Sequence, residues 1–257
     1  MQWDTITLDV DDAIATLTVD RPESLNALNV DTLEAIEDAV AEAETQDARV
    51  LILTGAGEKA FIAGADISYM QDLTTPEAQA YAELGHRVAD AIESFPGVTI
   101  AAVNGYAFGG GCELALACDL RVASERAVLG QTEIDLGIVP GWGGTQRLTR
   151  LVGDEIARRL IFFGERVDAS DANELDLVGE VVAHDQLESH VRDMAAELAA
   201  KPAVALRTAK EALNQVQETH QHAGLAYERR AWAGLFGTHD QREGMEAFVE
   251  KRDPEFE

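Results

Sequence analysis

A buried strand, three glycines and a helix follow one another between residues 98 and 117, and this run constrains the fold most strongly. The apolar stretch 98–103 predicts a buried strand, and residues 113–117 predict a helix. The glycines at 109–111 lie between them. The first turn of a helix has free N–H groups and a partial positive charge, and glycine lets another molecule approach that backbone closely. The run therefore predicts a site for an anion or a developing oxyanion.

Glu113 lies in the first turn of this predicted helix. Taken alone, an acid at this position is more often a partner of the helix dipole than a catalyst. Two other segments, 61–66 and 130–144, also combine glycines with carboxylates or small residues, and the second contains Glu133. These three segments are the candidate places for chemistry.

Short apolar strands alternate with amphipathic helices through the first half of the chain. The pattern predicts a strand, a turn and a strand within residues 1–20, and further strands at 50–54 and 120–123. It predicts helices at 31–45 and 76–94. Residues 61–70 are predicted to form a loop. This order favours an α/β fold with parallel strands. After residue 143 helices dominate, predicted at 144–151, 154–163, 168–174, 185–200, 203–217 and 220–236.

The chain is strongly acidic, with 47 acidic against 20 basic residues and a formal net charge of −27. A charge of this sign opposes binding to nucleic acid and to anionic membranes. It also destabilises a compact chain by self-repulsion, which molar salt screens to a range of roughly 3 Å. With only four lysines, this composition predicts adaptation to a salt-rich cytoplasm.

Several other kinds of site are not supported by the sequence. Cys112 and Cys118 are six residues apart and do not share a helix face, so we expect free buried thiols rather than a disulfide or a metal site. His220 and His222 have no further ligand set nearby and are interpreted as a solvated helix face. Dinucleotide, Walker A and serine hydrolase motifs are missing, and no signal peptide or membrane-spanning stretch is predicted. We expect no metal and a cytoplasmic protein.

Residues 100–153 resemble the signature core of the enoyl-CoA hydratase, or crotonase, superfamily. The resemblance extends to DRPESLNALN at 20–29, LTGAGEKAFIAGADI at 53–67 and REGMEAFVEKR at 242–252. It implies a crotonase-like α/β spiral of ββα units with a C-terminal helical trimerisation section. We therefore expect a core over residues 1–195, a helical section over residues 196–257, and a homo-oligomer that is a trimer or a dimer of trimers.

The resemblance also implies catalytic roles for particular residues. The backbone N–H groups of Ala65 and Gly110 match the oxyanion hole that binds the thioester carbonyl. Glu113 and Glu133 match the two glutamates that hold a water molecule and act as acid and base. Gly141 matches a position whose backbone N–H lies near that water.

Other matching positions concern the coenzyme A part of the substrate, and no separate cofactor is implied. The first active-site loop and two basic positions are expected to contact it, namely Lys59, Ala63, Ala65, Asp66, Ile67, Phe248 and Lys251. Phe248 and Lys251 match contacts that come from a neighbouring subunit. Ser68 stands where some hydratases have another lysine, so one ionic contact is expected to be missing.

Because both glutamates are present, the resemblance implies a hydratase that converts trans-2-enoyl-CoA into 3-hydroxyacyl-CoA. The alternatives are an enoyl-CoA isomerase and a specialised hydratase for branched or aromatic acyl chains. A non-catalytic, RNA-binding relative is disfavoured by the negative charge. The acyl-chain length and the metabolic pathway stay open.

Overall fold

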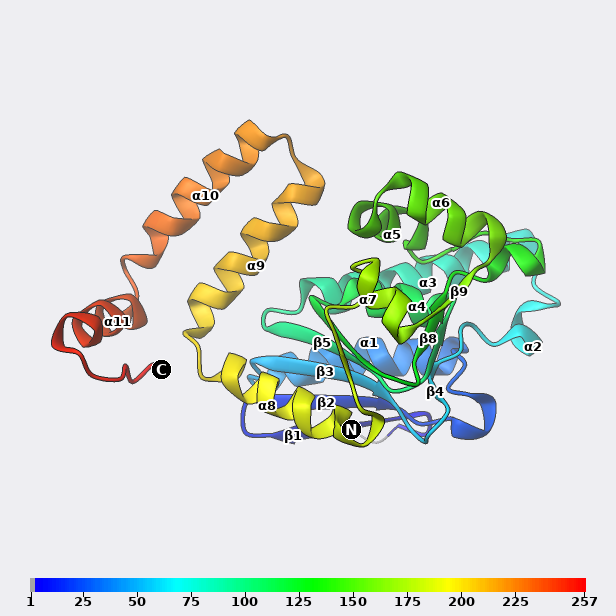
Figure 1. Cartoon of the computed structure of the whole chain (residues 1–257), viewed down its shortest axis with the longest axis horizontal. Helices are drawn as coiled ribbons and strands as arrows, with labels where there is room; N and C mark the ends of the chain where they lie inside the picture. Colours follow the sequence, from blue (N-terminus) through cyan, green and yellow to red (C-terminus); the bar gives the residue numbers. More distant parts are fainter. Residues whose placement is uncertain (1–2) are drawn as a thin grey trace.

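The computed structural model describes residues 3–257, except for the side chain of Gln217. Two β-sheets form its centre (Figure 1). One sheet has the order β1-β2-β3-β5-β7-β10, with strands Ile6–Asp11, Ile14–Val19, Val50–Gly55, Val98–Val103, Leu120–Ser124 and Glu180–Val182 in that order. The other has the order β4-β6-β8-β9, with strands Ala60–Ile62, Tyr106–Phe108, Val128–Gly130 and Arg166–Asp168.

Successive pairs of strands repeat one plan. In the pairs β3 and β4, β5 and β6, and β7 and β8, the first strand joins the six-stranded sheet and the second joins the four-stranded sheet. Helical segments follow these pairs, namely α2 (Ile67–Met70) with α3 (Thr75–Ser94), α4 (Gly110–Ala117) and the 3₁₀ turn η2 (Glu133–Leu136). The strands contributed to each sheet by these units pair in parallel. The predicted α/β class with ββα units is confirmed.

The six-stranded sheet is covered on both faces, so its central strands are apolar along their whole length. On β3, Leu51 and Leu53 belong to the main core together with α1 (Val30–Thr45) and α3. Val50 and Ile52 alternate with them and join a second cluster that includes residues of α8 (Leu187–Ala199). The continuous apolar run at 50–54 therefore reflects a strand that is buried on both sides.

The remaining helices surround the sheets and then leave them. Helices α5 (Gly144–Val152), α6 (Asp154–Phe163) and α7 (Ala169–Glu174) belong to the compact body, whereas α9 (Ala203–Glu218), α10 (Gln221–Leu235) and α11 (His239–Glu250) extend away from it (Figure 1). We call α9–α11 the C-terminal arm. The expected division after residue 195 falls inside α8, and the arm begins at Ala203.

One buried lysine fixes the base of the C-terminal arm to the core. Lys210 of α9 donates to Asp119 Oδ2 at 2.8 Å and to the Gly97 carbonyl at 3.1 Å. The same Asp119 oxygen accepts from the backbone N–H of Thr99 at 2.7 Å. The arm is thereby attached to the starts of β5 and β7.

The prediction of a loop over residues 61–70 is wrong. This segment contains the end of β4 and the short helix α2, whose N-cap Asp66 accepts from the backbone N–H of Ser68 at 3.1 Å. β4 is only three residues long, and such a short strand leaves no period-2 pattern in the sequence. Its partner strands β6, β8 and β9 are equally short, so the second sheet is recognisable only in three dimensions.

Candidate active site

Glu113 and Glu133 line the same cavity, which has a volume of about 570 Å³. Glu113 comes from α4 and Glu133 is the first residue of η2, so β7 and β8 separate them in the chain. Ala63, Ala65, Ile67, Gly110 and Gly141 line the cavity as well. The structure thus brings together most of the site residues that the sequence predicts.

The three glycines at the N-terminus of α4, Gly109–Gly111, are required by local geometry and close packing. A Cβ atom at Gly111 would lie 1.9 Å from the carbonyl oxygen of Ile62, and one at Gly110 would lie 2.1 Å from Cζ3 of Trp142. Gly109 has a φ of 48°, which is in the left-handed region. These contacts fix the N-terminus of α4 beside the cavity, where its first-turn N–H groups lack intrahelical acceptors.

The loop that carries Ala65 is held by backbone hydrogen bonds on both sides. Leu28 donates its N–H to the Gly64 carbonyl at 2.9 Å, and the Leu28 carbonyl accepts from the Asp66 N–H at 2.7 Å. Gly64 has a φ of 104°, and a Cβ there would approach the Phe108 carbonyl to 3.2 Å. The Ala65 backbone therefore has a fixed position on the wall of the cavity that Gly110 also lines.

Glu113 is buried and is held by the turn that precedes α5. Its Oε1 accepts from the backbone N–H groups of Trp142 and Gly144, both at 2.7 Å. Burial raises the pKa of Glu113, and these hydrogen bonds act in the opposite direction because they favour the ionised form. The sequence did not identify these two donors, and the Gly-x-Gly-Gly pattern at 141–144 is the signal that could have done so.

Glu133 is also buried and lacks such a pair of backbone donors among the described residues. Burial raises the pKa of Glu133 to about 7, and the negative charge of Glu113 contributes to the rise. Glu133 therefore carries a proton part of the time at neutral pH. Two acids with different environments in one cavity are suited to opposite roles in proton transfer.

Gln131 is a site residue that the sequence analysis missed. With its amide nitrogen oriented toward Glu133, it donates to Oε1 at 2.9 Å and to Oε2 at 3.2 Å. A Cβ atom at Gly144 would lie 2.9 Å from the same amide group. Gln131 thus contacts Glu133 and also the turn that holds Glu113. An amide two residues before an acid, as in Gln131-Thr132-Glu133, is the only signal in the sequence.

The residues expected to contact coenzyme A fall into two groups. Ala63, Ala65 and Ile67 line the cavity, and Asp66 is the N-cap of α2 and forms an ion pair with Arg21 at 3.3 Å. The others lie elsewhere, with Lys59 exposed just before β4 and with Phe248 and Lys251 at α11. Because α11 is at the end of the C-terminal arm, away from the cavity-forming elements, these last two do not reach the cavity of their own chain (Figure 1).

The four lysines differ in their partners. Lys210 pairs with Asp119, and Lys201 pairs with Glu197 at 3.1 Å. Within residues 3–257, Lys59 and Lys251 have no carboxylate within 4.0 Å. These two lysines are therefore available to bind an anion.

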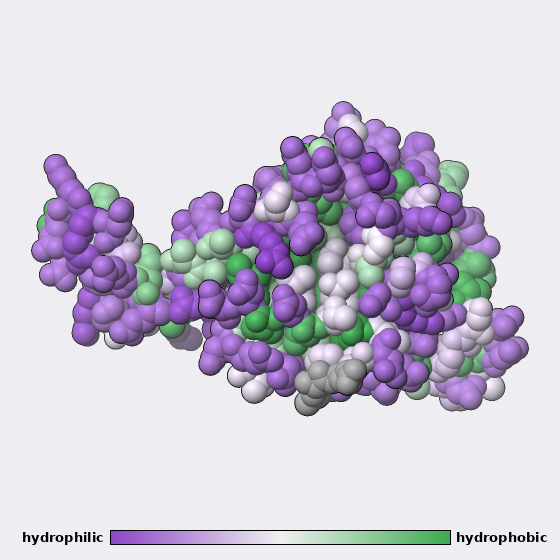
Figure 2. All heavy atoms as spheres, turned by 90° about the horizontal axis from the view of Figure 1, so that it is seen from below, coloured by the Kyte–Doolittle hydropathy of each residue, from purple (hydrophilic) through white to green (hydrophobic). Residues whose placement is uncertain are grey.

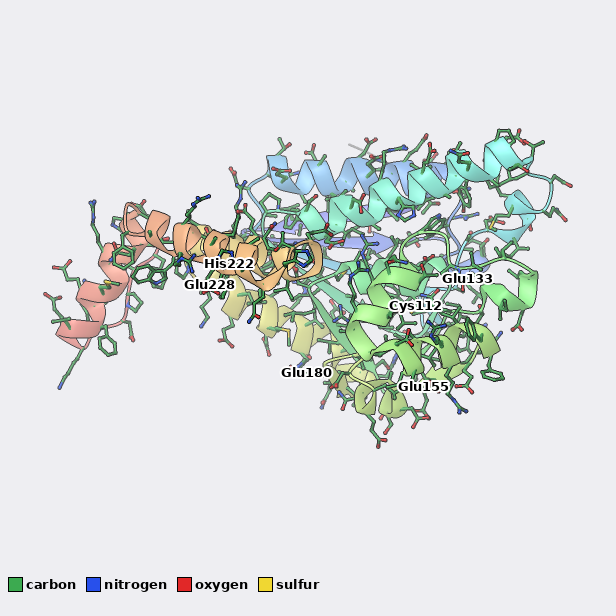
Figure 3. All side chains as sticks on the ribbon, turned by 90° about the horizontal axis from the view of Figure 1, so that it is seen from above. Cys112, Glu133, Glu155, Glu180, His222 and Glu228 are labelled. Carbon is green, nitrogen blue, oxygen red and sulfur yellow. The ribbon has the colours of Figure 1, made fainter. Side chains whose placement is uncertain are left out.

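The cysteines and histidines lie as the sequence analysis expected. Cys112 and Cys118 are free and buried, and burial raises the pKa of each thiol to about 12. Figure 3 shows Cys112 and Glu133 inside the compact body and His222 on the C-terminal arm. His220 and His222 are exposed. Among the described residues, no group of three or more His, Cys, Asp or Glu could hold a metal ion.

The described part of the chain also contains no helix that is long and apolar enough to cross a membrane. The face in Figure 2 is covered largely by hydrophilic residues, with apolar and neutral residues in a hollow near its centre.

The repeated ββα units place the chain in the mixed α/β class with a crotonase fold. Residues 9–257 match the family model described as enoyl-CoA hydratase/isomerase, and the chain belongs to this family. A crotonyl-CoA hydratase of Syntrophomonas wolfei is 43% identical over 257 residues, which are 100% of this chain and 99% of that protein. A short-chain-enoyl-CoA hydratase of Clostridium acetobutylicum is 43% identical, covering 98% of this chain and 97% of the relative.

Solved structures show the same likeness. The crystal structure of an enoyl-CoA hydratase from Bacillus anthracis superposes with a TM-score of 0.94 at 39% identity, covering 98% of this chain and 99% of the other. The fold predicted from the resemblance is therefore confirmed over nearly the whole chain.

Proposed function

We propose that this chain is an enoyl-CoA hydratase that adds water across the double bond of trans-2-enoyl-CoA, reversibly, to give 3-hydroxyacyl-CoA. The observation that carries the proposal is the pair of buried carboxyl groups, Glu113 and Glu133, in one cavity beside the N-terminus of α4. The relatives named as hydratases, which match over almost their full length, support it.

In this proposal the backbone N–H groups of Ala65 and Gly110 bind the thioester oxygen. Negative charge grows on that oxygen when water adds at C3, and two fixed donors in a water-poor cavity stabilise it. Loss of one such donor typically costs about 3–4 kcal/mol of transition-state stabilisation. The close packing at Gly110 and the hydrogen bonds around Ala65 supply the required rigidity.

Glu113 is assigned as the base and Glu133 as the acid. Two backbone donors stabilise the ionised form of Glu113, whereas Glu133 has a pKa near 7 and can release a proton at neutral pH. Glu113 takes a proton from water while the water oxygen bonds to C3, and Glu133 gives its proton to C2. The N–H of Gly141 is proposed to orient the water, because Gly141 lines the cavity next to the turn that holds Glu113.

Coenzyme A is part of the substrate, and no resident cofactor is proposed. Ala63, Asp66 and Ile67 would contact its nucleotide end, with Lys59 close to a phosphate. Phe248 and Lys251 would come from a neighbouring copy, because α11 lies away from the cavity of its own chain. The two lysines without carboxylate partners are the two assigned to phosphates. Ser68 supplies no charge at the position where some hydratases have lysine.

A homo-oligomer, as a trimer or a dimer of trimers, is proposed because the C-terminal arm exposes large apolar side chains. These are Leu213, Val216, Leu225, Trp232, Phe236, Met245, Phe248 and Val249. Apolar surface of this kind marks a protein interface. Light scattering after size exclusion in molar KCl would measure the mass, and a monomer would contradict the proposal.

We also propose that the protein works in a salt-rich cytoplasm. The net charge of −27 and the small number of lysines support this, because high salt screens the repulsion between surface carboxylates.

The central test is incubation of the purified protein with crotonyl-CoA in molar KCl, followed by mass analysis of the thioester. Hydration adds the mass of one water, whereas an isomerase leaves the mass unchanged. Turnover of branched or aromatic enoyl-CoA with no turnover of crotonyl-CoA would instead support the specialised hydratase. Absence of turnover with all of these thioesters would contradict the proposed function.

A further inference from the structure

One tryptophan ring lies between two glycines at the edge of the cavity. Trp142 is buried, and it lines the cavity together with Glu113. A Cβ atom at Gly85 would lie 2.2 Å from Nε1 of the indole, and one at Gly110 would lie 2.1 Å from Cζ3. No side chain larger than hydrogen fits at either position while the ring stays where it is.

Gly85 is unusual because it lies in the middle of α3. A glycine inside a helix costs roughly 0.5–1 kcal/mol relative to alanine, since it loses more conformational freedom on folding. Here it has a normal helical backbone and is needed only for the space it leaves to the indole. The position of the Trp142 ring is therefore fixed by Gly85 of α3 and Gly110 of α4.

Tyr81 holds the Trp142 ring from the side. Their rings meet edge to face with centroids 5.4 Å apart. The Tyr81 hydroxyl donates to the Leu28 carbonyl at 2.5 Å, and the Tyr69 ring packs against Tyr81 with ring centroids 5.2 Å apart. Burial raises the pKa of Tyr81, so the hydroxyl keeps its proton and remains a donor. We call Tyr81 and Trp142 the aromatic wall.

The aromatic wall is directly connected to the groups that would react with the substrate. The backbone N–H of Trp142 donates to Glu113, and its ring packs against Gly110, a proposed oxyanion donor. An acyl chain with its carbonyl at Gly110 and its C3 at Glu113 would therefore continue toward this wall. The small or apolar residues Met70, Leu73, Ala78 and Ala82 line the same cavity.

We propose that Trp142, held in place by Tyr81, limits the acyl chain and makes short, straight 2-enoyl-CoA thioesters the preferred substrates. This inference rests on the proposed function. Met70 and Leu73 are only partly buried and can adjust to a longer chain. The Trp142 ring cannot withdraw from the cavity toward α3 or α4, because it is close-packed against the backbones of Gly85 and Gly110.

The main test is Trp142→Leu, which removes the ring and keeps the backbone N–H that holds Glu113. The readout is the ratio of kcat/KM for trans-2-decenoyl-CoA to kcat/KM for crotonyl-CoA. We expect this ratio to rise at least about tenfold, since each methylene that an apolar pocket accepts or rejects is worth about 10–200-fold. Trp3→Leu is the matched control because Trp3 packs on the core outside the cavity lining, and its ratio should stay unchanged.

Gly85→Ala, alone and combined with Trp142→Leu, tests the steric mechanism. Gly85→Ala alone leaves Trp142 in place, so its effect does not depend on the empty space that leucine creates. Gly85→Ala favours the helix but pushes the indole toward the cavity. It should lower kcat/KM for crotonyl-CoA at least about tenfold with Trp142 present, as a group lost from alignment can do. In the Trp142→Leu background the same change should have little effect, which a double-mutant cycle measures.

The outcomes separate this inference from the function on which it rests. A wild-type protein that hydrates crotonyl-CoA but prefers decenoyl-CoA, or an active Trp142→Leu variant with an unchanged ratio, would overturn the role of the wall and leave the hydratase intact. Equal effects of Gly85→Ala in both backgrounds would overturn it as well. A wild-type protein inactive on every enoyl-CoA would contradict the proposed function itself.

Discussion

Glu113 and Glu133 share one cavity but have different surroundings. Two backbone N–H groups face Glu113, whereas Glu133 has the Gln131 amide and the negative field of Glu113. Burial, and after it the negative charge of Glu113, raises the pKa of Glu133 to about 7. At the scale of single residues, the proposed division of roles thus rests on different surroundings of two chemically identical side chains.

Replacement of either acid tests the assigned roles. Glu113→Gln and Glu133→Gln should each lower kcat for crotonyl-CoA hydration by at least about 10², because a positioned acid or base contributes about 10²–10⁴. Stopped or continuous assays of thioester absorbance measure this. Near-normal turnover by either variant would refute the mechanism, and a circular dichroism spectrum identical to wild type shows that folding is intact.

The raised pKa of Glu133 also predicts a pH-dependent stability. Between pH 4.5 and about 7 the folded chain binds the Glu133 proton more tightly than the unfolded chain does, so the free energy of unfolding falls as pH rises through this window. Glu133→Gln should therefore stabilise the protein at pH 8, by up to about 3 kcal/mol, and have little effect at pH 4. Thermal unfolding at both pH values measures the difference, with exposed Glu155→Gln as the control. Equal shifts at both pH values would disprove it.

The sequence indicated the acids but not what holds them. Glu113 alone resembled a helix-start acid, and only its place after the glycines, with Glu133 in a second motif, made it a catalytic candidate. Trp142, Gly144 and Gln131 could not be assigned, because two of them act through backbone N–H groups and the third through an orientation set by the fold. A backbone N–H is present in almost every residue type, so the glycines at 141–144 indicate a tight turn but not which carboxylate it holds.

At the scale of elements, long strands and helices were predictable and short ones were not. The strand at Val98–Val103 and the helix α3 lie within one residue of their predicted bounds, since burial and periodicity act over many residues. The strands of the second sheet have three residues each and depend on pairing with one another. Tertiary contacts rather than local sequence determine them.

Because Lys210 attaches α9 to the core and Lys201 does not, replacing each lysine should change the free energy of unfolding by different amounts. Lys210→Met should lower the free energy of unfolding by about 1.5–3 kcal/mol, because it leaves Asp119 partly buried without its cation. Lys201→Met removes an exposed pair with Glu197 and should change it by less than about 0.5 kcal/mol. Denaturant unfolding at one protein concentration measures both. Similar values for the two variants would show that the contact with Asp119 does not hold the arm.

At the scale of the whole molecule, we expect repulsion within the net charge of −27 to make stability and assembly depend on salt. Tenfold dilution from molar KCl lengthens the screening distance from about 3 Å to about 10 Å, and the carboxylates then repel one another over longer distances. We expect activity and the oligomer to be retained in molar KCl and lost in dilute buffer, with recovery on adding salt. Activity assays and light scattering across a KCl series measure this, and full activity without salt would contradict the adaptation to a salt-rich cytoplasm.

The position of α11 at the end of the C-terminal arm has a consequence for mixtures of variants. If Lys251 binds substrate in the cavity of a neighbouring copy, a Glu113 variant still provides Lys251 to its neighbour. A Lys251 variant still has both glutamates in its own cavity, so the two variants together form a complete site. Glu113→Gln and Lys251→Ala proteins, each impaired alone, should therefore regain turnover after they are unfolded, mixed and refolded together. Such complementation would show that each active site contains residues of two chains, so that two inactive variants of the gene can restore activity to each other.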